Sequence, residues 1–351
     1  MNSDDKNTMM VLQEQQQDTR HWPAERLYGD YRFRPYALAR CVEQFQEQLV
    51  PHLRAWARHG VHFSLSPWNS PAWIGLLYGH VSRDAAEFHA HALEEYARCF
   101  SAGWIEIGPY HLPPVPSLLQ INSRTGPGFG LLVAVTCEPM MYRFPHGHPD
   151  PAKRGEVNVQ FLEPSAVRDA IDPLLQILGT RLRMIVLRPG RVYPTEHYPF
   201  ARFLDRLDGL LAALPRTGRY AVELSTPDHL RPEYFACLQN HGAAHVIGDA
   251  DDMPPLLEHV QRPDVLTSDV VILRTPQQDG PFATPGRTEG ISAEVRLGIL
   301  ETVRRCLDEK KTLYVDLGDR PEGSAPLSLL GLMALLDKDL AKLSPLRKYA
   351  A

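Results

Sequence analysis

The sequence has few cysteines, no long apolar run and no large excess of one charge. Its five cysteines lie far apart and include no Cys-x-x-Cys pair, which argues against a disulfide framework and against a zinc knuckle. The longest apolar-leaning run, residues 325–336, is too short to span a bilayer. Lysine and arginine number 37 against 42 aspartates and glutamates, a net charge of −5, so no overall basic field attracts nucleic acid or a membrane surface.

The first 20 residues are polar and lack the apolar stretch of a signal peptide. We therefore expect a cytoplasmic protein with a disordered tail, because so polar a segment gains too little from burial to become ordered. No Gly-x-Gly-x-x-Gly motif follows a predicted strand, and we expect no cofactor. The whole chain of 351 residues is 44% hydrophobic, which is enough apolar material for a large core.

From residue 62 onward, short β-rich runs alternate with amphipathic helical patterns. The predicted strands cover residues 62–66, 104–107, 130–136, 183–188, 219–224, 245–248, 270–274 and 312–317. Eight strands with helices or long connections between them predict a parallel sheet that closes into a TIM-like (β/α) barrel. An open doubly wound sheet is the alternative, and the missing glycine motif counts against it.

We divide the chain into a disordered tail (1–20), an N-terminal arm and helix packing on the barrel (21–60), the barrel domain (61–342) and a C-terminal tail (343–351). The arm interleaves arginines with aromatic residues, a composition that could bind single-stranded nucleic acid. The net negative charge favours a strap across the barrel instead. Two long connections rich in proline and glycine, 137–163 and 275–290, leave the C-terminal ends of predicted strands, where we expect functional lids or disordered insertions.

Four segments, in the same order, resemble the YecE-like family, domain of unknown function number 72. They are Ser66-Pro67-Trp68 with Trp73 to Tyr78; Tyr96 to Phe100 with Ile105-Glu106-Ile107 and Tyr110 to Pro113; Tyr220 to Leu224; and Arg320 to Leu327, which contains Glu-Gly-Ser-Ala-Pro. The resemblance implies a TIM-like barrel and no established reaction. Several polar residues of the family pattern are replaced here, for example by Gly108-Pro109 after the second strand and by Gly318-Asp319 before the last motif.

The period of two along each strand predicts which side chains point into the barrel. Glu106 and Glu223 alternate with apolar residues that face the helices, so both should face inward. Arg188, Arg274 and Asp316 share this parity at strand ends. An unpaired charge inside a barrel is costly, so such groups should gather at the wet C-terminal mouth or neutralise one another.

From this pattern we predict a ligand site at the mouth. Its catalytic candidates are Glu106, Glu223 and Asp249, and its ligand-binding candidates are Trp68, Trp73, Arg188, Arg274, Asp316, Asp319 and Glu322. Carboxylates as acid and base, with arginines holding an anionic or phosphorylated small molecule, indicate a hydrolase or lyase. The alternative is a non-catalytic binding protein in which the same groups form an ion-pair network. A glycosidase is less favoured, because Glu106 and Glu223 lie on the second and fifth strands.

Other chemistry has weaker support. The pair His146 and His148 lacks a third ligand nearby, so we predict no metal site and do not favour a metal-dependent nuclease. Cys137 follows the third strand but has no identifiable base, so we expect it to pack as an apolar side chain. Trp68 and Trp73 could stack on a sugar or base, or could cover the top of the barrel. We expect a small-molecule partner and no membrane; the sequence does not indicate an oligomeric state.

Overall fold

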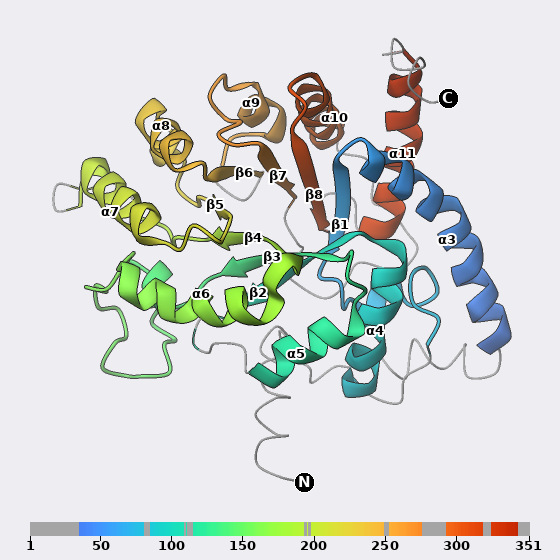
Figure 1. The fold of residues 1–351 in the computed structure, drawn as a ribbon, viewed down its shortest axis with the longest axis horizontal. Helices are drawn as coiled ribbons and strands as arrows, with labels where there is room; N and C mark the ends of the chain where they lie inside the picture. Colours follow the sequence, from blue (N-terminus) through green and yellow to red (C-terminus); the bar gives the residue numbers. More distant parts are fainter. Residues whose placement is uncertain are drawn as a thin grey trace, which may run out of the picture.

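The structure of the protein, a computed structural model, describes residues 35–80, 85–108, 110, 115–192, 195, 198–248, 253–275, 293–318 and 324–342. Within them, eight parallel strands form one sheet that curves into a nearly closed barrel, with helices around its outside (Figure 1). The TIM-like barrel is confirmed, and the open doubly wound alternative is excluded. The predicted arm up to residue 34 and both predicted tails lie outside the described residues.

Each observed strand overlaps a predicted strand in the sequence. The strands are β1 (Val61–Ser66), β2 (Ala102–Ile107), β3 (Gly130–Val135), β4 (Leu182–Leu187), β5 (Tyr220–Val222), β6 (Ala244–Gly248), β7 (Val270–Arg274) and β8 (Thr312–Gly318). The largest difference is β5, which ends at Val222 rather than at residue 224. Beyond it the Glu223 N–H still donates to the Leu187 carbonyl of β4 at 3.0 Å, but β6 pairs only with Ala221 and Val222.

The order of strands around the ring is β1-β8-β7-β6-β5-β4-β3-β2. The first and last strands of the chain are therefore neighbours, and β8 pairs with every residue of β1. Within the described residues no backbone ladder joins β1 to β2, so the ring has one seam. A side-chain contact crosses it, because His62 Nδ1 lies 2.9 Å from Ser101 Oγ, just before β2.

The helices form the outer layer. They are α3 (Pro35–Arg58), α4 (Ala85–Cys99), α5 (Val115–Arg124), α6 (Pro164–Leu178), α7 (Phe200–Ala213), α8 (Pro232–His241), α9 (Leu256–Gln261), α10 (Ala293–Asp308) and α11 (Ala325–Lys342). Helices α3 and α11 lie side by side against β1. Among the described residues, no helix combines the length and the apolarity that crossing a bilayer requires.

Apolar side chains fill both faces of the sheet. The larger cluster lies between strands and helices, and includes Phe63, Leu131 and Leu273. A smaller cluster fills the inside of the ring: Ala102, Trp104, Leu132, Ala134, Met184, Val186, Ala221, Ala244, Val246, Val270, Ile272 and Tyr314. The ring is therefore a packed core, as in other barrels of this size, and polar groups have room at its ends.

The long connection of residues 137–163 is compact, with Glu138 at its centre. The Glu138 carboxylate accepts a hydrogen bond from Lys153 Nζ at 2.7 Å and lies 3.1 Å from His148 Nε2. The Asn158 amide donates to two backbone carbonyls of the same loop at 2.8 and 3.0 Å. These contacts favour a folded loop over the disordered insertion that the sequence left open. The second long connection, beyond Thr275, lies outside the described residues.

Candidate functional site

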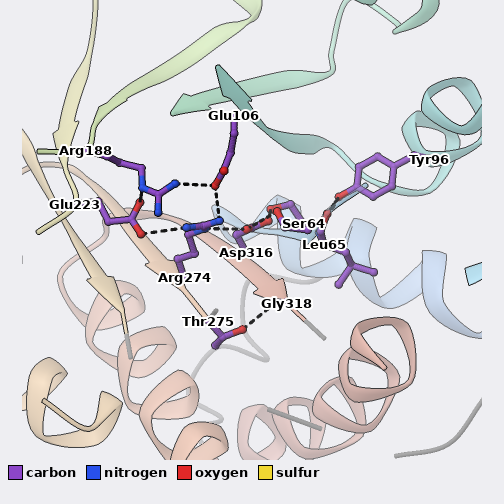
Figure 2. A network of polar contacts seen from close by, with 11 residues as sticks. Ser64, Leu65, Tyr96, Glu106, Arg188, Glu223, Arg274, Thr275, Asp316 and Gly318 are labelled. Atoms are coloured by element: carbon purple, nitrogen blue, oxygen red, sulfur yellow. Dashed lines mark hydrogen bonds and ion pairs between the residues drawn. The ribbon is translucent and has the colours of Figure 1, made fainter. Parts of the chain in front are cut away.

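Five charged side chains gather inside the C-terminal end of the barrel (Figure 2). Each stands two residues after an apolar side chain that faces into the ring, so the period of two carries it to the same face. The pairs are Trp104 and Glu106, Val186 and Arg188, Ala221 and Glu223, Ile272 and Arg274, and Tyr314 and Asp316. The structure therefore brings together five of the residues predicted for the site.

Arg274 lies at the centre of this charged cluster. Its Nη2 donates to Glu106 Oε1 at 2.7 Å, and its Nη1 donates to Glu223 Oε1 at 3.1 Å. Its guanidinium also lies 4.7 Å from the centre of the Trp104 ring, a cation–π contact with the top of the apolar core. Burial disfavours the charged guanidinium, but Glu223, Glu106 and Asp316 outweigh that effect and raise the pKa of Arg274. It is therefore a fixed positive charge.

Arg188 completes a closed ring of ion pairs. Its Nη1 donates to Glu106 Oε1 at 2.8 Å, and its Nε lies 2.9 Å from Glu223 Oε2. Each glutamate thus contacts both arginines, and each arginine contacts both glutamates. The two glutamates come from β2 and from the end of β5, which the sequence suggested could be too far apart to cooperate. The arginines connect them across the mouth.

Asp316, the register partner of Arg274 on β8, lies beside the ring of ion pairs. Ser64 and Ser66 of β1 donate to its two carboxylate oxygens at 2.7 and 2.6 Å. Arg274 Nε lies 3.5 Å away, an ion pair too long for a hydrogen bond. Burial raises the pKa of Asp316, and the opposing effects of Arg274 and the two serines do not cancel it. At 1% exposure, Asp316 is a buried anchor.

Two members of the cluster reach solvent. The Glu106 side chain is 34% exposed and that of Arg188 is 26% exposed, whereas Arg274 is 9% exposed. Burial works to raise the pKa of Glu106, but the guanidiniums of Arg188 and Arg274 outweigh it and lower that pKa. Glu106 is therefore ionised at neutral pH, where it can accept a hydrogen bond or a proton but does not act as an acid.

The remaining predicted site residues fall into two groups. Trp68 and Trp73 are 6% and 1% exposed and belong to the core. Trp73 stacks on Tyr78, whose hydroxyl donates to the Trp68 carbonyl. This burial favours the interpretation that both rings cover the barrel top rather than bind a ligand face. Asp249, Asp319 and Glu322 lie outside the described residues.

Three supporting residues, Ser64, Ser66 and Trp104, were not among the predicted site residues. Ser64 and Ser66 alternate with apolar Phe63 and Leu65, so the parity argument that found the charged residues also identifies the serines. Trp104 precedes Glu106 by two residues and is identified in the same way. Cys137 is buried, and burial raises the pKa of its thiol to about 12, which favours the expectation that it packs as an apolar side chain.

Comparison with known proteins supports this architecture. A family model described as "Protein of unknown function DUF72" matches residues 62–350. The crystal structure of a DUF72 family protein from Thermotoga maritima is 20% identical, with a TM-score of 0.54; the match covers 79% of this chain and 99% of that one. One from Enterococcus faecalis is 12% identical, with a TM-score of 0.51, and covers 79% and 95%. Comparison with curated proteins gives no significant match.

Proposed function

Because the chain belongs to the DUF72 family, also called YecE-like, which carries no established reaction, we propose a function from the site itself: the barrel mouth binds a small ligand with one anionic group, and Glu106 acts on it as a general base. The observation that carries this proposal is the pairing of Glu106 with Arg188. They are oppositely charged, 2.8 Å apart and both partly exposed, and buried residues hold them in place.

The donors of Arg188 indicate where the anionic group would bind. Its Nη1 and Nε contact Glu106 and Glu223, whereas its Nη2 has no partner within the described residues. Guanidinium groups bind carboxylates and phosphates well through such donors. Three carboxylates outnumber two guanidiniums in the cluster, and this excess of negative charge disfavours a ligand with several anionic groups. A ligand hydroxyl would then donate to Glu106.

The charge state of Glu106 narrows the reaction class. An ionised carboxylate beside a guanidinium can take a proton from a hydroxyl or from water, as hydrolases and lyases require. A glycosidase of the two-carboxylate type also needs a protonated acid next to the scissile bond. Asp316 is the carboxyl with a raised pKa, but it is buried, with 1% of its surface exposed. This distribution supports base chemistry over glycoside cleavage.

A second candidate is a binding protein without catalysis. It is favoured by the closed ring of ion pairs, in which each glutamate and arginine already has oppositely charged partners. Such a ring is stable without a ligand, and structural ion-pair networks show similar pKa shifts.

Calorimetric titration with inorganic phosphate and with glycolate tests binding. We expect Arg188→Leu to weaken anion binding about tenfold or more, the loss of one charge-assisted hydrogen bond. Glu301→Gln, on the outer face of α10, is the matched control and should bind as the wild type does. Binding of neither anion by the wild-type protein overturns the proposal.

Turnover of a panel of phosphoesters, lactones and glycosides separates the two candidates. We expect activity on a phosphoester or lactone that Glu106→Gln abolishes while anion binding persists. Anion binding without turnover of any of the three classes favours the non-catalytic protein. Turnover that survives Glu106→Gln removes the general base from the proposal.

A further inference from the structure

Two histidines and a glutamate meet at the start of α4, away from the charged cluster. They are His80, Glu87 and His91, all half-buried. One donor atom from each lies within 4.8 Å of the others. His80 Nε2 is 3.7 Å from Glu87 Oε1, and the ring centres of His80 and His91 are 4.1 Å apart. We propose that these three side chains bind a zinc ion or a similar divalent transition metal.

The separations suit a tetrahedral ion. Donor atoms at zinc distances of about 2.1 Å lie about 3.4 Å from one another in tetrahedral geometry. The 3.7 Å between His80 and Glu87 needs little change, and the remaining donor atoms, all within 4.8 Å of one another, would approach further on binding the ion. Two imidazoles and one carboxylate are a common zinc ligand set that leaves a fourth position for water. Nitrogen donors also favour transition metals over magnesium or calcium.

Helix α4 presents its ligands in one stripe. Glu87 and His91 are four residues apart, so they lie on the same face of the helix. Glu95 follows after four more residues, and its carboxylate accepts hydrogen bonds from the backbone N–H groups of Gly79 at 2.7 Å and His80 at 3.2 Å. One helix face therefore carries two ligands and also fixes the backbone of the third. Such supporting contacts hold ligands in position before the metal arrives.

A buried nitrogen without a partner is a separate indication. His80 Nε2 is enclosed by protein and makes no hydrogen bond with the described residues. Leaving a buried polar atom unsatisfied costs about 1–3 kcal/mol. The nearby Glu87 oxygen, at 3.7 Å, is too far for a hydrogen bond. A metal ion bound by His80 Nε2 would satisfy that nitrogen.

A comparable cluster in the same fold lacks these properties. Asp208, Cys237 and His241 also have donor atoms within 4.8 Å, between α7 and α8. There His241 Nε2 already lies 2.8 Å from Asp208 Oδ1. Burial and Asp208 raise the pKa of Cys237 to about 12, so its thiol stays protonated and is a poor ligand. We make no proposal for it, but it provides a matched control.

Zinc titration of the full chain, after dialysis against a chelator, tests the proposal. We expect one ion per chain in competition with a zinc-binding dye. Cobalt should give the visible absorption of a tetrahedral ion, and magnesium should not compete. His91→Gln and His80→Gln should each weaken zinc binding about 100-fold, and Glu95→Gln about tenfold through loss of positioning. His241→Gln should bind zinc as the wild type does.

Two outcomes overturn the site: no stoichiometric zinc in the wild-type protein, or equal zinc affinity in His80→Gln and His241→Gln. Circular dichroism establishes that each variant is folded. If His80→Gln does not fold, Glu87→Gln replaces it, because the loss of the charged ligand should weaken zinc about tenfold while the helix remains. The result is independent of the barrel mouth, since anion titration and turnover report on Glu106 and Arg188 alone.

Discussion

Arg274 and Glu106 meet at 2.7 Å inside the barrel although 168 residues separate them in the sequence. Arg274 ends β7, and Glu106 is the last inward-facing residue of β2, so their contact crosses the ring rather than following a strand ladder. Arg274 also contacts Glu223, and through it the charged cluster becomes one connected unit. Its removal should therefore affect several carboxylates at once.

Arg274→Met should destabilise the fold strongly. The substitution leaves Glu106, Glu223 and Asp316 with less compensation for their burial, and removing one partner of a buried ion pair costs about 3–5 kcal/mol. Chemical denaturation measures this loss. Arg304→Met removes two exposed ion pairs on α10 and should lower the free energy of unfolding by less than about 1 kcal/mol. Equal losses in the two variants would contradict the central role of Arg274.

Asp316→Asn should keep or increase stability at pH 7. The pKa of Asp316 is raised in the folded protein above the usual 3.8, so ionisation opposes folding as the pH rises through that range. Asparagine avoids this cost and still offers an oxygen to Ser64 or Ser66. Asp316→Ala removes both acceptors and should be destabilising by about 1–3 kcal/mol. A large loss in Asp316→Asn would show that the charge itself holds Arg274 in place.

The stability of the fold should fall as the pH drops below about 6.5. His245 and His259 are buried, and their Nε2 atoms lie 2.9 Å apart. The chain of contacts continues from His245 to the Tyr234 hydroxyl and from His259 to the Gly248 carbonyl, each at 2.9 Å. Burial lowers the pKa of both histidines below the usual 6.5, so the unfolded chain takes up protons first. Each histidine contributes up to about 1.4 kcal/mol per pH unit.

Chemical denaturation at several pH values from about 7.5 to about 5 measures how the stability depends on pH. His259→Gln should reduce the slope of stability against pH, because glutamine has no proton to gain. His241→Gln, at the surface between α7 and α8, is the control. If the slope of stability against pH is the same in the wild type and in His259→Gln, the buried histidine pair is not its cause.

Gly298→Ala should destabilise the packing of α10 on α9. Alanine is the better helix former by about 1 kcal/mol. Here, however, its Cβ would lie 2.7 Å from Leu256 Cγ, and the buried position leaves little room to relax. We expect a net loss of about 1–3 kcal/mol. Adding Leu256→Ala to Gly298→Ala should cost less than the sum of the two single losses, and the difference is the coupling energy between the two sites. Additive losses would show that the two residues do not touch.

The sequence predicts more of the fold than of the site's contacts. Alternation along single strands places Glu106 and Arg274 inside the ring, because it depends only on the period of two. The contacts of both arginines with both glutamates depend on ring closure and strand register, which no single segment encodes. The His80 cluster shows the same limit. The spacing of Glu87 and His91 is visible on the helix, but the approach of His80 to them depends on the tertiary fold.

The pairing of the first strand with the last has a consequence for synthesis. The side-chain hydrogen bonds that join them, from Ser64 and Ser66 to Asp316, span 252 and 250 residues. During translation β1 emerges long before β8, and within the described residues β8 is its sole ladder neighbour. The growing chain must therefore hold an unpaired strand until nearly all of the barrel has been made. A ribosome that stalls before residue 312 would release a protein with an open, aggregation-prone edge.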